Sequence, residues 1–141
     1  MNSIHRALTA HPAAPEVPTG ERSAEAECME ACLEAAQVGL VAADACLDEP
    51  DVAQLRECAR TQQDCAAVAA ATAAVLARRG FPQPGDGHAV LLPLLEACRG
   101  AGAACAEASG RHAETYEHCA VAAEAARRCE RACAALLARR G

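Results

Sequence analysis

The fold is decided by residues 23–50, which read SAEAECMEACLEAAQVGLVAADACLDEP. Ser23 suits the N-cap of a helix, and the acidic residues that follow it favour the positive end of the helix dipole. The pattern stops at Pro50, because proline cannot continue a helix. On a helix that advances about 100° per residue, three cysteines fall within about 40° of one another: Cys28, Cys32 and Cys46. The stretch therefore predicts one helix with a cysteine face.

Three further segments have helical patterns that end in glycine or in basic residues: 51–79, 88–109 and 112–140. Gly80 and the loop Phe81 to Gly87 separate the first two, and Gly110 closes the second. Four helices with short connections predict an all-α protein, an antiparallel four-helix bundle.

Residues 1–22 are expected to form an N-terminal arm ahead of the bundle, which spans residues 23–141. The arm begins with a short helical turn at Ser3 to Thr9 and continues into a proline-rich segment. A chain of 141 residues is long enough for one domain with a single core.

Composition and charge exclude several classes of protein. Alanine exceeds a quarter of the sequence, as is typical of helical proteins. The net charge of −6 argues against a nucleic-acid-binding surface, which needs clustered positive charge. Charged or amide residues interrupt every apolar stretch, so we expect no membrane span. The first residues lack a signal-peptide pattern, which indicates a cytoplasmic protein.

Each predicted helix presents cysteines on one face, ten in all. A helical rise of about 1.5 Å per residue and an antiparallel arrangement sort them into two groups. Four lie near the end that holds the Asp48 and Gly110 loops: Cys46, Cys58, Cys105 and Cys119. Six gather toward the opposite end: Cys28, Cys32, Cys65, Cys98, Cys129 and Cys133. We interpret the groups as two separate thiolate sites.

Cysteines in a reducing compartment stay mostly as thiols, so their number points to metal or redox chemistry rather than to disulfides. Thiolates are soft donors that select Cu(I), Zn(II) or iron-sulfur clusters, and the facing helices of a bundle can bring them within bonding distance. The sequence has no paired carboxylates, phosphate loop or Ser-His-Asp set that would support an enzyme. A metal-binding protein is therefore the first interpretation.

Several alternatives stay open on the residues alone. A redox protein would use the pair Cys28 and Cys32 or the pair Cys129 and Cys133. The four-thiolate group could hold an iron-sulfur cluster for electron transfer or a structural Zn(II) ion. Cysteine is also a small hydrophobic residue, so the faces could simply be core.

The sequence resembles the cytosolic four-helix-bundle copper storage proteins of bacteria. The lead-in Leu8-Thr9-Ala10-His11-Pro12 and the surroundings of the cysteines carry the resemblance, notably Asp64-Cys65-Ala66-Ala67-Val68, Leu94-Leu95-Glu96-Ala97-Cys98, Glu117-His118-Cys119 and Arg127-Arg128-Cys129-Glu130-Arg131-Ala132-Cys133. The resemblance implies Cu(I) storage by core thiolates and assembly as a homo-oligomer, a tetramer of bundles. It also implies that His118 ligates copper or helps it pass at the mouth of the bundle.

The chain departs from the family where other members carry further cysteines: at Ala35, Gly39, Ala42, Ala69, Gly102, Ser109, Ala122 and Ala126. Nearly half of the cysteine stripe is thus replaced, mostly by smaller residues. We therefore expect two separated clusters with a reduced copper capacity, in place of a continuous copper-filled tube.

Overall fold

The computed structural model describes residues 2–79 and 88–140, and within these ranges it contains helices and no strands. The all-α prediction is thereby confirmed. The helix end at Gly80 and the loop Phe81 to Gly87 lie outside the described residues. In chain order the elements are α1 (Ser3–Ala10), the 3-10 helix η1 (Ala14–Glu16), α2 (Thr19–Leu47), α3 (Val52–Arg79), α4 (His88–Gly110) and α5 (Glu117–Arg140).

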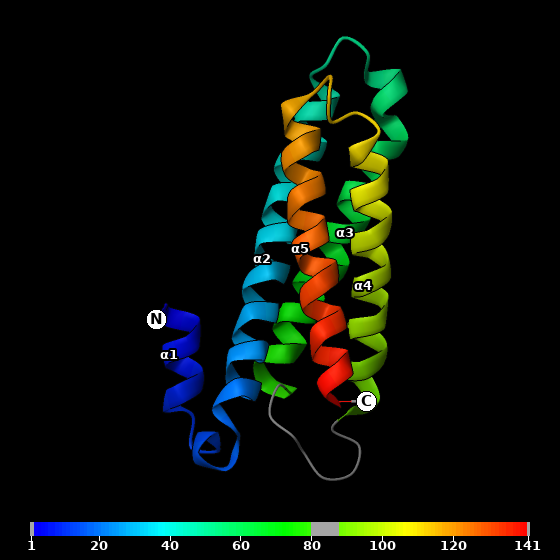
Figure 1. The fold of residues 1–141 in the computed structure, drawn as a ribbon. Coiled ribbons are helices and arrows are strands. Elements are labelled where there is room, and N and C mark those ends of the chain that lie inside the picture. Colours follow the sequence, from blue (N-terminus) through cyan, green and yellow to red (C-terminus); the bar gives the residue numbers. More distant parts are fainter. Residues whose placement is uncertain (1, 80–87, 141) are drawn as a thin grey trace.

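The four long helices form an antiparallel bundle in which α2 and α4 each pack against both α3 and α5 (Figure 1). The connections α2–α3 and α4–α5 lie at one end, which we call the loop end. The opposite end, where α5 finishes, is called the terminus end. Helix α1 lies against the lower half of α2, and Leu8 and Val17 are buried in the core at the terminus end. The arm predicted for residues 1–22 thus contains α1 and η1.

Helix α2 begins at Thr19, four residues earlier than the predicted start at Ser23. Pro18, in an extended conformation, precedes the first helical residue. Arg22 then fixes this start, because its Nη1 donates a hydrogen bond of 2.6 Å to the carbonyl oxygen of Ala14. The contact across the turn between η1 and α2 replaces the serine cap that the sequence suggested.

Helix α5 begins at Glu117, later than the predicted start at His112. Residues 111–115 form turns, closed in part by a hydrogen bond of 2.9 Å from the Tyr116 amide to the His112 carbonyl. The Tyr116 hydroxyl donates to Asp51 Oδ2 at 3.0 Å and so joins the two connections at the loop end. This hydrogen bond favours a turn at residues 111–115, where the local sequence alone is compatible with a helix.

The helices approach one another closely in the middle of the bundle. A Cβ atom on Gly39 would lie 2.9 Å from the backbone oxygen of Gln62, so α2 and α3 are in near backbone contact there. A Cβ atom on Gly102 would lie 3.0 Å from the backbone oxygen of Ala126, which places α4 equally close to α5. The buried side chains around these two contacts are mostly small, and Gln62 is the larger exception.

A buried ion pair closes the terminus end. The side chains of Glu25 and Arg140 are 0% and 3% exposed and form a close ion pair. Arg140 Nε also donates to Glu21 Oε1 at 3.0 Å. Burial raises the pKa of Glu25 to about 7, although Arg140 acts in the opposite direction. The end of α5 is thus held against the beginning of α2 by the contacts of Arg140 with Glu21 and Glu25.

Charged residues interrupt α4, as expected, at Glu96, Arg99 and Glu107. Over Ala89–Gly110 it is the one helix among the described residues that is long and apolar enough to cross a membrane. Its Leu91, Leu95 and Cys98 are fully buried against the other helices, and its charged residues lie on the exposed face. A third of its apolar window is buried, so packing in the bundle core accounts for part of its apolar composition.

Replacing Gly39 with alanine should destabilise the fold by about 1–3 kcal/mol, because a backbone atom of α3 occupies the space for the new methyl group. The gain of about 1 kcal/mol in helix propensity does not offset this loss. Gly100 is the matched control, since nothing lies within 4 Å of its Cβ position. Urea unfolding of the metal-free protein should show stabilisation for Gly100→Ala, and destabilisation of both variants would contradict the packing described.

Glu25 should make the metal-free fold less stable as pH rises. Its pKa is raised from 4.5 to about 7, so the folded state holds this proton where the unfolded state has lost it. The contribution is fully present below pH 4.5 and disappears as pH rises through about 7. In urea unfolding across this range, Glu25→Gln should remove that part of the pH dependence, whereas Glu27→Gln on the exposed surface should retain it. An unchanged slope in Glu25→Gln would show that Glu25 is ionised throughout.

Candidate metal centre

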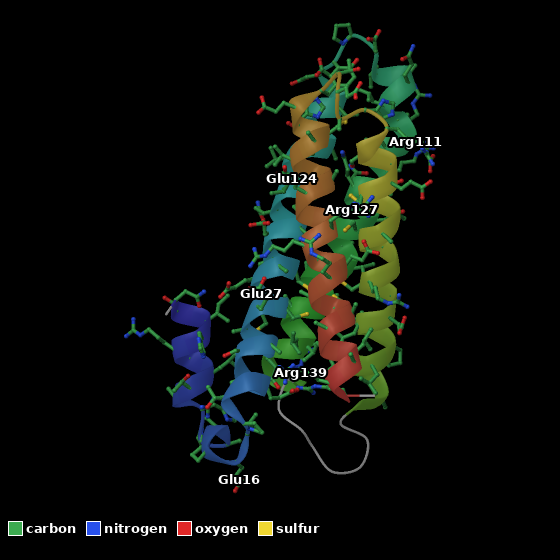
Figure 2. All side chains as sticks on the ribbon, in the orientation of Figure 1. Glu16, Glu27, Arg111, Glu124, Arg127 and Arg139 are labelled. Carbon is green, nitrogen blue, oxygen red and sulfur yellow. The ribbon has the colours of Figure 1, made fainter. Side chains whose placement is uncertain are left out.

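All ten cysteines are free and buried, with exposed fractions of 2% or less. They come from all four long helices, and their sulfur atoms lie between the helices, whereas the labelled Glu27, Glu124 and Arg127 lie on the outside (Figure 2). The helical register that predicted a cysteine face on each helix is therefore confirmed. The interior offers soft donors from every side.

Five thiols form a terminus-end group, to which α2, α4 and α5 contribute. The shortest sulfur to sulfur distance is 3.5 Å, between Cys98 and Cys129. Cys32 lies 3.9 Å from each of these two, and Cys28 lies 3.9 Å from Cys133. Four of the five have all their sulfur atoms within 4.8 Å of one another: Cys32, Cys98, Cys129 and Cys133. Such spacing suits thiolates that bridge soft metal ions.

Three thiols form a loop-end group: Cys46 on α2, Cys58 on α3 and Cys119 on α5. Their sulfur atoms all lie within 4.8 Å of one another. His118 stands beside them and is partly exposed, with Nδ1 at 3.6 Å from Cys119 Sγ and at 4.0 Å from Cys46 Sγ. The group thus has three sulfur donors and one nearby ring nitrogen.

Glu49 sets the orientation of that ring. Its Oε2 lies 2.9 Å from His118 Nε2, which places the ring proton on Nε2 as the donor. The lone pair on Nδ1 is then free to face the thiols of Cys46 and Cys119. A carboxylate behind the ligand histidine is the usual arrangement in metal sites, where it fixes the tautomer and raises the basicity of the ring.

Cys65 and Cys105 form a middle pair that belongs to neither group, and this corrects the predicted division into four and six thiols. They contact each other and pack with Ala106 and Ala126. The prediction placed both connections of the loop end at one height. Figure 1 shows that α3 begins beyond the end of α4, so a residue near the end of α4 lies level with a deeper residue of α3. The structure therefore has three groups of thiols.

Hydrogen bonds among the thiols lower the pKa of some and raise the pKa of others. In the terminus-end group, hydrogen bonds from Cys129 and Cys133 lower the pKa of Cys98, and one from Cys133 lowers the pKa of Cys28 to about 5. The donor Cys32 has a raised pKa for the same reason. In the middle pair, Cys65 lowers the pKa of Cys105 to about 7. These groups offer a thiolate to a metal ion more readily than isolated buried thiols would.

The loop-end thiols differ in this respect. Burial raises the pKa of Cys46 and of Cys119, with the nearby Cys58 adding to the shift. Metal binding must therefore displace protons that these thiols hold firmly. The two ends of the bundle are chemically distinct.

Sequence reasoning missed two residues, Glu49 and Gln62. Gln62 is a fully buried amide whose side chain lies against the loop-end thiols. Its spacing was a usable signal, because it lies four residues after Cys58 and three before Cys65, on the cysteine face of α3. The positions at which the expected cysteines are replaced are likewise buried in the described core: Ala35, Gly39, Ala42, Ala69, Gly102, Ser109, Ala122 and Ala126.

Comparison with solved structures gives close matches to a cytosolic copper storage protein from Streptomyces lividans. The form with five coppers has a TM-score of 0.78 and 48% identity, over 86% of this chain and 98% of that one. The form loaded with 10 copper equivalents has a TM-score of 0.84 and 44% identity, over 96% of this chain and 98% of that one. A histidine-to-alanine variant of that protein has a TM-score of 0.78 and 49% identity, over 85% of this chain and 97% of that one.

A search of curated proteins finds no match. The model of one protein family, which is described as copper storage protein, matches residues 21–138. That range contains all four long helices apart from their outermost residues, and all ten cysteines. The chain therefore belongs to the copper storage protein family.

Proposed function

We propose that this protein binds and stores Cu(I) through its core thiolates, as a cytosolic protein and without catalytic turnover. The observation that carries the proposal is the set of ten buried free thiols, grouped so closely that several sulfur atoms can share one ion. Membership of the copper storage family supports it, as does the likeness to a cytosolic protein loaded with copper.

The three thiol groups replace the two clusters that the sequence predicted. The terminus-end group supplies five thiolates, the middle pair two, and the loop-end group three together with His118 Nδ1. Each Cu(I) replaces thiol protons, so the positive ion offsets the thiolate charge inside the core. The capacity is that of separate clusters, and is lower than that of a continuous stripe.

Structural Zn(II) is the second candidate, and one observation favours it. Four thiols that lie within 4.8 Å of one another can surround a single tetrahedral ion: Cys32, Cys98, Cys129 and Cys133. A redox pair has less support, because each of these cysteines faces partners on other helices rather than one resolving thiol. An iron-sulfur carrier has less support because the sequence lacks the compact cysteine runs of ferredoxins.

We also propose that the bundles assemble as a homo-oligomer, a tetramer by the family resemblance. Helix α2 supports this with three exposed leucines at seven-residue intervals: Leu33, Leu40 and Leu47, which are 47%, 51% and 59% exposed. Leucines at this spacing lie along one side of a helix and suit packing against another helix.

Fully reduced protein, titrated anaerobically with Cu(I) against a competing chelator, should take up several ions per chain and gain thermal stability as it fills. Replacing the loop-end cysteines by serine, in Cys46→Ser/Cys58→Ser/Cys119→Ser, should remove only the loop-end share. Replacing Cys32, Cys98, Cys129 and Cys133 should remove the terminus-end share. Metal per chain is counted after gel filtration, with Zn(II) titrated in parallel and circular dichroism as the check on folding.

Failure to compete for Cu(I), with all ten thiols shown to be reduced, would overturn the storage proposal. Tight uptake of a single Zn(II), lost with the terminus-end cysteines, would support the structural zinc alternative instead. Copper uptake that neither set of serine variants reduces would place the metal outside the terminus-end and loop-end groups.

His118→Ala should weaken copper binding at the loop end by about tenfold or more, because it removes the ring nitrogen that faces Cys46 and Cys119. His112→Ala is the matched control, a partly buried histidine in the α4–α5 connection at the same end. Competition titrations of both variants give the comparison. Equal losses in the two variants would mean that histidine at this end acts through general charge and not as a ligand.

A further inference from the structure

We propose that Gln62, supported by Ser109, is a positioning residue that forms the inner wall of the loop-end copper site. In this role its amide donates a hydrogen bond to the Cys58 thiolate and separates the copper bound there from the middle pair. The inference rests on the proposed Cu(I) binding, and it assigns a role to two residues that have no sulfur.

Every polar atom of the Gln62 side chain is engaged, although the residue is fully buried. Nε2 lies 3.1 Å from Ser109 Oγ and 3.4 Å from Cys58 Sγ, so each of its two hydrogens has an acceptor. Oε1 lies 3.6 Å from Cys46 Sγ and accepts the thiol proton. The amide therefore touches two of the three loop-end thiols.

The Gln62 amide stabilises the site more when metal is bound than when it is absent. A buried amide costs free energy unless it is hydrogen-bonded, and a neutral thiol is a weak acceptor. When Cu(I) displaces the Cys58 proton to solvent, the sulfur becomes a thiolate and the same N–H bond becomes charge-assisted and stronger. On the Cys58 side the amide is thus already oriented for the copper-bound state, whereas Oε1 loses the thiol proton of Cys46 when that sulfur binds copper.

Ser109 completes the wall. Its Oγ lies 3.7 Å from Cys58 Sγ on one side and 3.8 Å from Cys105 Sγ on the other. The Gln62 amide and the Ser109 hydroxyl therefore stand between the loop-end group and the middle pair. An amide and a hydroxyl are both poorer bridging ligands for Cu(I) than a thiolate is. A copper cluster on one side of the wall therefore has no soft donor through which to continue.

The test is an anaerobic Cu(I) competition titration of wild type, Gln62→Leu, Ser109→Ala and Gln63→Leu, with absorption spectra of the thiolate-to-copper bands. Loop-end copper is identified as the share that Cys46→Ser removes. Gln62→Leu should lower its affinity about ten- to a hundredfold, as loss of a hydrogen bond to a metal ligand commonly does. The charge-transfer bands should move to longer wavelength, because the Cys58 thiolate becomes more electron-rich.

Ser109→Ala should lower the loop-end affinity and move the absorption bands in the same direction, by smaller amounts. This variant tests the wall even if Gln62→Leu fails to fold. Gln63→Leu is the matched control, since Gln63 is exposed on the same helix. It should match wild type, and terminus-end copper should be unchanged throughout. Cys105→Ser should leave loop-end affinity as it was, because the wall separates the two groups.

Wild-type loop-end affinity and spectra in Gln62→Leu, with the variant folded by circular dichroism, would overturn the inference while leaving copper storage intact. Loss of loop-end copper in Cys105→Ser would overturn the separation. No uptake by any protein, wild type included, would overturn copper storage and this inference with it.

Discussion

Close contact between helix backbones is the constraint on which the rest of this structure depends. Gly39 brings α2 against α3, and Gly102 brings α4 against α5, so the space they enclose is largely limited to small side chains, with Gln62 as the larger exception. Alanine and cysteine satisfy that limit, and cysteine alone adds a donor atom. The fully buried leucines of the described core lie toward its ends: Leu76, Leu91, Leu95 and Leu136 at the terminus end and Leu55 at the loop end. The narrow interior therefore brings sulfur atoms from separate helices within a few ångströms of one another.

Such an interior has few ways to accommodate negative charge. Among the described residues, Glu25 and Arg140 are the charged side chains withdrawn from solvent at its terminus end, and they are paired with each other. Within residues 2–79 and 88–140, no arginine side chain is buried near the loop-end thiols. Hydrogen bonds between thiols can support an occasional thiolate, as the lowered pKa of Cys98 shows. A fully ionised set of thiolates needs a cation inside the core, and a soft monovalent ion supplies that charge where no side chain does.

The sequence was sufficient for the fold because its signals were periodic and repeated. Cysteines at steps of four, seven and eighteen residues fixed the inner face of each helix, and glycine or proline fixed most of the ends. The starts of α2 and α5 were placed wrongly, because Arg22 and Tyr116 act through contacts with other segments that local patterns do not contain. The family resemblance supplied copper, which spacing alone left open among several metals.

The division of the thiols was the least predictable feature. Counting residues from the connections assumed that all four helices end at one level, and a modest offset between α3 and α4 was enough to move Cys105 from the loop-end group to Cys65. Gln62 was overlooked for a different reason, since a glutamine among cysteines suggests a solvent-facing position until its depth is known. Heights along a bundle and the burial of single polar residues are properties of the assembled helices.

Tyr116 gives the loop end an optical property that the other end does not have. The chain has one tyrosine and no tryptophan, and the ring of Tyr116 lies with its centroid 5.5 Å from that of His118. Ultraviolet emission from the protein therefore comes mainly from a single fluorophore beside the loop-end thiols. Metal binding at the loop-end group can be followed without a label or a reporter mutation, whereas metal binding at the terminus-end group leaves that fluorophore undisturbed.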